Sequence, residues 1–245
     1  FQEYVSVQFS EERNIYVPKE AQTMSSNSYL VDVISTKKFR DALFTDPSLV
    51  KRNLTQSGEE YTDSSTLLSI NDETNTVLYV NTAEKSGEPV SLNKLLEQSI
   101  SFVNSHGGWT DNYRLVQIDE VQQTVLFRIY DSFGYPIFND NGMSELMQIW
   151  GDSTIHQYLR NKISIGRQVE TKKITMMSGV EAAEQLKKED DLDLAFVEDL
   201  VLGLNMSKNP NEPLISLEPS WFYKYKGQWH PLDTGGQGGD DLGLE

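Results

Sequence analysis

The sequence predicts an α+β fold of two domains, each an antiparallel β-sheet packed against one or two helices. Short segments alternate between apolar and polar residues, which is typical of half-buried strands. Other segments carry apolar residues at helical spacing directly after a serine. A polar stretch with Gly and Pro, Glu84–Pro89, separates two well-patterned parts of the chain. We therefore expect one domain at residues 1–84, a second at 85–234 and a flexible Gly/Asp-rich tail at 235–245.

The first domain reads as an antiparallel sheet with one main helix. Its predicted strands are Tyr4–Phe9, Ile15–Val17, Tyr29–Ile34, Thr66–Ile70 and Val77–Asn81. Ser35 is a suitable cap for a helix that carries Phe39 on its apolar face. Asp46, followed by proline, begins a second, short helical piece that is expected to turn Leu49 and Val50 inward.

The second domain begins with the clearest helix of the chain, capped by Ser91 and ended by Gly107 and Gly108. Its predicted apolar face comprises Leu92, Leu95, Leu96, Ile100, Phe102 and Val103. Another helix follows Ser178, whose spacing to Glu181 matches a capping box. The predicted strands are Tyr113–Asp119, Thr124–Tyr130, Tyr135–Phe138, Glu145–Trp150, Thr154–Arg160, Asp199–Met206 and Leu214–Tyr225.

Composition excludes several classes of function. The chain has 37 Asp and Glu against 21 Lys and Arg, a net charge of −16, so it repels a nucleic acid backbone and we expect no nucleic acid partner. The longest apolar runs, such as Val77–Val80, are too short to span a bilayer. Because the sequence opens on Phe1, a preceding segment with an anchor is compatible with it. The lack of cysteine excludes disulfides, thiolate nucleophiles and Cys-based metal sites.

No residue pattern indicates a catalytic or metal site. The three histidines, His106, His156 and His230, have no metal-ligand spacing, and a structural or solvated role is the preferred interpretation. A Ser-His-Asp triad stays open, because the fold assembles such a site, but no G-x-S-x-G segment nominates a nucleophile. Ser35 and Ser91 each stand three residues before a lysine, as in S-x-x-K enzymes, yet helix capping explains both serines.

Two further patterns have simpler explanations than ligand binding. Asn139–Gly142 resembles part of a calcium loop, but the first and twelfth positions would be Ile137 and Gln148, so a β-turn is predicted. The acidic residues Glu189, Asp190, Asp191 and Asp193 read as a solvated loop. In the aromatic segment Trp221–Tyr225, Trp221, Tyr223 and Tyr225 share one face, for which core packing is favoured over a binding stripe. We therefore predict no catalytic, cofactor-binding or metal-binding residues and no cofactor.

Several segments, taken in their order along the chain, resemble the YycH (WalH) family. They are Asp41–Arg52, Ser57–Asp63, Tyr79–Asn81, Ile149–Asp152 and Leu217–Trp229. The resemblance extends from about Val17 to Leu232 and implies the central and C-terminal α+β domains of that family. It also implies an N-terminal domain and a transmembrane helix, neither of which this sequence contains.

The resemblance implies a regulatory function. Family members are accessory regulators of the YycF/YycG (WalR/WalK) two-component system, which controls cell-wall metabolism in low-GC Gram-positive bacteria. Their globular part lies on the extracytoplasmic side of the cell membrane, and they act with a related protein, YycI, on the sensor histidine kinase. Two alternatives stay open: a hydrolase of wall polymers with a carboxylate pair, and a structural spacer.

Overall fold

The computed structural model describes the whole chain except residues 1, 12, 84–88, 153, 209–211 and 234–245. The chain divides into two compact units, and each combines segments that are distant in the sequence. Unit 1 comprises Phe1–Ser28, Val169–Asn205 and Ser216–Glu245, and unit 2 comprises Tyr29–Gln168 and Met206–Ile215. Most of the predicted linker and the whole predicted tail lie outside the described residues.

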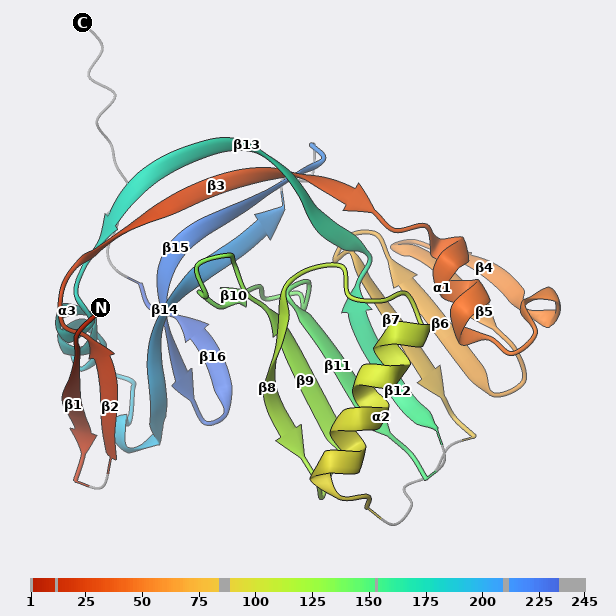
Figure 1. Cartoon of the computed structure of the whole chain (residues 1–245), viewed down its shortest axis with the longest axis horizontal. Coiled ribbons are helices and arrows are strands. Elements are labelled where there is room, and N and C mark those ends of the chain that lie inside the picture. The colour runs from red at the N-terminus through yellow and green to blue at the C-terminus, as the bar shows by residue number, and fades with distance from the viewer. Residues whose placement is uncertain (1, 12, 84–88, 153, 209–211, 234–245) are drawn as a thin grey trace, which may run out of the picture. The chain divides into compact units, whose positions relative to one another are not determined.

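Unit 2 is built on an eight-stranded antiparallel sheet in the order β4-β5-β6-β7-β12-β11-β9-β8 (Figure 1). Its strands are β4 (Lys51–Thr55), β5 (Gly58–Thr62), β6 (Thr66–Asn71), β7 (Thr76–Asn81), β8 (Tyr113–Asp119), β9 (Thr124–Ile129), β11 (Glu145–Trp150) and β12 (Ile155–Asn161). The hairpin β4–β5 is absent from the sequence prediction. All of β4 is exposed, so its residues show no alternation of apolar and polar side chains.

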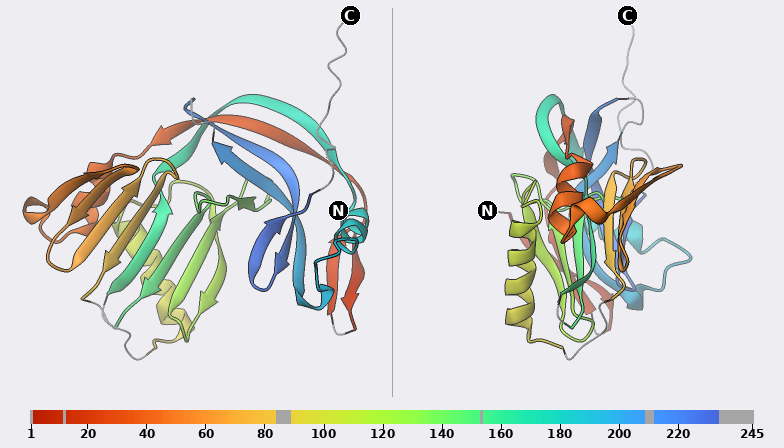
Figure 2. Two further views of the ribbon diagram at one scale, coloured as in Figure 1. Left: turned by 180° about the vertical axis from the view of Figure 1, so that it is seen from behind. Right: turned by 90° about the vertical axis from the view of Figure 1, so that its right-hand side faces the viewer.

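Helices α1 (Thr36–Leu43) and α2 (Leu92–Ser105) belong to unit 2, and Figure 2 shows α2 running along one face of the sheet. The core contains Phe39, Leu95 and Val103 from the helices and Leu68, Val77, Val125, Leu146 and Tyr158 from the strands. No helix in the described part of the chain combines the length and the apolar character that crossing a membrane requires.

Two helical predictions need correction at their ends. Leu49, in the 3₁₀ turn η1 (Pro47–Leu49), is 72% exposed, whereas Val50 packs against the core as predicted. In α2, Leu92 and Ile100 are also exposed. The reason is that the buried stripe of α2 is centred on a polar residue: Ser99 is fully buried, and its hydroxyl accepts a hydrogen bond from the Trp150 indole at 2.9 Å.

Unit 1 contains a two-stranded sheet, β1 (Tyr4–Ser10) and β2 (Arg13–Pro18), and helix α3 (Gly179–Leu186). The predicted capping box is present: the Ser178 hydroxyl accepts from the Glu181 N–H, and the Glu181 carboxylate accepts from the Ser178 N–H. The 3₁₀ turn η2 (Leu194–Phe196) and the short strand β16 (Gln228–Pro231) complete the elements that lie wholly in this unit.

Four long strands contribute residues to both units. They are β3 (Gln22–Val33), β13 (Ile163–Met176), β14 (Val197–Lys208) and β15 (Leu214–Tyr225). With β10 (Ile137–Phe138) they form a sheet in the order β10-β14-β15-β3-β13, and β16 pairs with β15. Of β3, only the end was predictable from the sequence pattern, and β13 is absent from the predicted strands.

The units differ from the predicted division into residues 1–84 and 85–234. Strand β7, which precedes the predicted boundary, pairs directly with β12, which follows it, and both strands belong to unit 2. Leu78, for example, lies opposite Leu159 in this ladder. A polar segment with Gly and Pro can therefore connect two parts of a single sheet as well as two domains.

Candidate functional site

The three histidines lie in separate structural contexts. The His106 imidazole stacks on Phe102, and its Nδ1 lies 2.8 Å from the carbonyl oxygen of that residue. His156 Nδ1 is 2.9 Å from the Asn81 carbonyl oxygen, and His230 stacks on Tyr223. Within the described ranges, no group of three or more His, Asp and Glu side chains could hold a metal ion.

The serines of the two S-x-x-K segments occupy helix starts but do not cap by their side chains. Ser35 and Ser91 are the N-cap residues of α1 and α2, and neither hydroxyl accepts a hydrogen bond from its helix. Both serines thus occupy the predicted N-cap positions, but the side-chain hydrogen bond that such a cap normally makes to the helix is not formed. Ser178, by contrast, makes the full set of capping bonds.

The two polar loops behave as predicted for turns. The Asn139 carboxamide oxygen accepts from the backbone N–H groups of Asn141 and Met143, and Gly142 has a φ of 78°. In the acidic stretch, the Asp193 carboxylate accepts from the Ala195 N–H at the start of η2. Both loops use their polar side chains to bind backbone donors.

The aromatic segment of β15 runs from the core to the surface. Trp221 is fully buried and Phe222 is 3% exposed, which confirms core packing for the first part of the segment. Further along, Tyr223 stacks on His230 from β16, and Tyr225 meets Phe196 of η2 edge to face. The outer part of the segment is thus half-buried and carries rings that solvent can reach.

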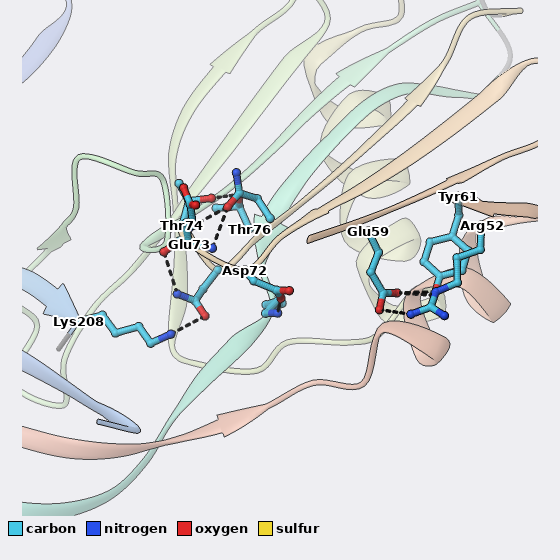
Figure 3. A network of polar contacts seen from close by, with 11 residues as sticks. Arg52, Glu59, Tyr61, Asp72, Glu73, Thr74, Thr76 and Lys208 are labelled. Carbon is cyan, nitrogen blue, oxygen red and sulfur yellow. Dashed lines mark hydrogen bonds and ion pairs between the residues drawn. The ribbon is translucent and has the colours of Figure 1, made fainter. Parts of the chain in front are cut away.

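The hairpin β4–β5 of unit 2 carries an ion pair between an arginine and a glutamate (Figure 3). Arg52 of β4 makes two hydrogen bonds to the Glu59 carboxylate of β5, at 2.5 and 3.3 Å, and the Tyr61 hydroxyl donates to the same carboxylate at 2.6 Å. The bond from Arg52, and then that from Tyr61, lowers the pKa of Glu59 below its ordinary value. Burial raises the pKa of the Tyr61 hydroxyl.

Two lysines bind the turn between β6 and β7. Lys162 pairs with the Asp72 carboxylate, and Lys208 Nζ donates to the Asn75 carboxamide oxygen at 2.9 Å. Figure 3 shows Lys208 extending toward this turn from another segment of the chain. Asn75 has a φ of 54° and is 2% exposed, so the turn is held in a conformation that few residues other than Gly and Asn adopt.

A buried arginine lies at the carboxyl end of α2. Arg160 of β12 is fully buried, and its Nη1 donates to the carbonyl oxygens of His106 and Gly108 and to the Tyr158 hydroxyl. Its guanidinium also faces the Phe39 ring, 5.4 Å from the centroid. A cation at a helix carboxyl end is electrostatically favourable, so Arg160 joins α2 to the sheet.

Two polar side chains next to Arg160 have raised pKa values. Burial raises the pKa of Asp111, although its carboxylate accepts from the Ile165 N–H at 2.9 Å and from the Thr110 hydroxyl at 2.8 Å. Burial also raises the pKa of Tyr113, whose hydroxyl donates to the Asn161 carboxamide oxygen. These groups bind one another and the backbone, and none of these hydrogen bonds pairs a nucleophile with a base.

The sequence patterns named single members of the clusters around Arg160 and Phe196, such as Phe39, His106 and Tyr225, but connected none of them to its partners. The members of each cluster come from separate elements, so no local spacing in the sequence connects them. A usable signal existed only at Lys226–Gly227, a two-residue connection between aromatic strands that is typical of a tight hairpin.

Comparisons with known proteins give one consistent result. A family model described as YycH protein, C-terminal domain, matches residues 12–239. The two-component system WalR/WalK regulatory protein YycH of Bacillus subtilis is 24% identical over 229 residues, which are 90% of this chain and 50% of that protein. The crystal structure of YycH from Bacillus subtilis has a TM-score of 0.77 and 22% identity, covering 96% of this chain and 58% of that one.

These matches confirm the resemblance seen in the sequence. The structural likeness shows a shared α+β fold with antiparallel sheets. The chain spans about half the length of the curated relative, so the activity of that whole protein does not pass to this chain by similarity alone.

Proposed function

The chain belongs to the family of the YycH protein C-terminal domain, and from this membership we propose that it is a non-enzymatic accessory regulator of a two-component system of the YycF/YycG (WalR/WalK) type. The match over residues 12–239 carries the proposal, because it covers nearly the whole chain. The similar protein from Bacillus subtilis is named as a regulatory protein of the WalR/WalK system. Control of cell-wall metabolism is the output that the resemblance implies.

The proposed mode of action is contact with proteins. The partners are a YycI-like protein and the extracytoplasmic part of the YycG/WalK sensor histidine kinase. The charged side chains around Glu59 and Asp72 are engaged in ion pairs that hold hairpins, which supports the non-enzymatic part of the proposal. The surface rings at Tyr225 and Phe196 support a binding role.

The proposed location is the extracytoplasmic side of the cell membrane. A single N-terminal helix that precedes these residues would hold the protein there. The absence of cysteine from the sequence is compatible with this location.

The test replaces this segment within the full-length protein in its own bacterium. One variant lacks residues 12–239, and a matched control carries an unrelated folded domain of similar size in their place. Kinase output is read from a reporter gene under the response regulator. If this segment itself contacts the partner proteins, kinase output should be altered in both variants. Restored output in the control would contradict recognition and indicate a structural spacer instead.

A further inference from the structure

An ammonium group of the chain lies against two aromatic rings in unit 1, one exposed and one half-buried. Lys226 Nζ is 4.7 Å from the centroid of the Phe196 ring and 5.0 Å from that of Tyr225. The two rings meet edge to face, with centroids 6.3 Å apart and planes at 89°. Both distances are within the range in which the negative face of a ring attracts a cation.

The backbone at Lys226 is unusual for the residue it carries. Tyr225 and Gln228 pair across the hairpin, which leaves Lys226 and Gly227 as a two-residue turn with φ values of 50° and 82°. Such a turn favours Asn, Asp or Gly at its first position, because positive φ brings the Cβ of other residues close to the backbone. Turn formation therefore does not explain the presence of lysine at this position.

The backbone that carries the two rings is held by contacts that do not involve the Lys226 ammonium. The Lys226 N–H donates to the Phe196 carbonyl oxygen at 3.3 Å. The Glu198 carboxylate accepts from the Gly227 N–H at 2.7 Å and pairs with Lys224 at 3.1 Å. Phe196 is nevertheless 48% exposed. The rings thus form a preformed surface that keeps its shape when the Lys226 side chain moves away.

We propose that Phe196 and Tyr225 form a recognition site for a basic side chain of a protein partner, and that Lys226 occupies this site in the free chain. A lysine on a flexible stem at an exposed position is easily displaced, since the attraction of a solvated cation to a ring is small. An incoming lysine or arginine makes the same contact and releases Lys226 into solvent.

The charge of the chain favours such a partner. With a net charge of −16, the protein attracts basic segments over a distance and repels acidic ones. Only one part of this inference rests on the proposed function, namely that the basic side chain belongs to a protein partner. The chemistry of the site is tested separately, so the two proposals can fail independently.

The experiment titrates the chain with the peptide acetyl-Gly-Lys-Gly-amide and follows the ring signals of Phe196 and Tyr225 by NMR. Removal of the internal competitor by Lys226→Ala should tighten binding about two- to fivefold, the ratio that a cation–π contact at an exposed site provides. Phe196→Leu keeps an apolar side chain but removes the ring face, and should weaken binding by a similar factor. The peptide with Gln in place of Lys should cause no shift.

The matched control is Lys187→Ala. Lys187 also lies over a ring, that of Phe9 at 5.6 Å, but this ring is buried, and the substitution removes the same charge. Equal tightening by Lys187→Ala and Lys226→Ala would overturn the proposal, because net charge alone would then explain the effect. Weaker binding by Lys226→Ala would overturn it too, since Lys226 would then be part of the site rather than its occupant.

Discussion

Trp221 is the largest side chain among those that the described residues bury completely. Replacement by alanine removes its transfer free energy and leaves a cavity, which together cost about 3–5 kcal/mol. That loss is a large share of the roughly 5–15 kcal/mol that stabilises a domain. We therefore expect Trp221→Ala to lower the free energy of unfolding in urea by this amount.

The half-buried Trp229 provides the control for this prediction. Trp229→Ala should cost distinctly less, because part of the ring is already in contact with water. A normal unfolding curve for Trp221→Ala together with loss of partner binding would refute the core assignment.

Asp111 gives a pH dependence of known sign. Burial raises the pKa of its carboxyl above the ordinary value of 3.8, so the folded state retains a proton at a pH where the unfolded state has lost it. The contribution of Asp111 to the free energy of unfolding is fully present below pH 3.8. It is lost as the pH rises through the pKa of Asp111 in the folded state. Asp111→Asn removes the titration while it keeps an oxygen that can accept the Ile165 N–H.

The measurement is urea unfolding of both proteins at a series of pH values from about 3 to 7. We expect the wild type to lose stability relative to Asp111→Asn as the pH rises. Glu59→Gln is a useful contrast, because the pKa of Glu59 is lowered and its contribution is lost as the pH falls. Parallel pH curves for wild type and Asp111→Asn would count against the burial argument.

At the scale of elements, the contact between α3 and β2 depends on a glycine. A Cβ at Gly179 would lie 2.4 Å from Val17 Cβ and 2.8 Å from the Pro18 carbonyl oxygen. Helix propensity alone predicts that Gly179→Ala stabilises α3. We expect the opposite, a loss of about 1–3 kcal/mol, because overpacking forces the helix away from the strand.

Urea unfolding also tests this prediction, with Glu184→Ala on the exposed side of α3 as the control. That change should stay within about 0.5 kcal/mol of the wild type. A gain in stability for Gly179→Ala would mean that the helix and strand separate without cost.

Elements with local signals were predictable, and elements without them were not. The capping box at Ser178 and the alternation of β1 are complete within a few residues of sequence. Strand β13 gave no such signal, because most of its middle residues, such as Glu170 and Lys172, are exposed and polar in succession. Its existence depends on pairing with a strand far away in the sequence.

At the scale of the whole molecule, we expect weak binding to soluble partner domains. The exposed large apolar side chains are spread over several elements, for example Tyr16 on β2, Leu54 on β4 and Phe133 in a turn. Tight interfaces need contiguous buried area. Confinement to one membrane would raise apparent affinity by about 10²–10⁴ through effective concentration. Helix pairing within the bilayer could add to this.

Calorimetric titration of this chain with the soluble domains of a YycI-like protein and of the kinase measures the affinity directly. Micromolar or weaker dissociation constants are expected for the chain without a membrane segment. A nanomolar constant would contradict this prediction, because contacts of these residues alone would then suffice for tight binding.

The sequence by itself determined the α+β class, the capped helices and the family, because these depend on side-chain patterns and motifs within short stretches. Only the tertiary structure decided that β7 and β12 pair in one sheet, that Arg160 is buried and that the Lys226 ammonium lies over the Phe196 ring. Each of these facts depends on contacts between residues distant in the sequence. Strand pairing and the burial of a charge are set by the free energy of the assembled fold, which no local pattern contains.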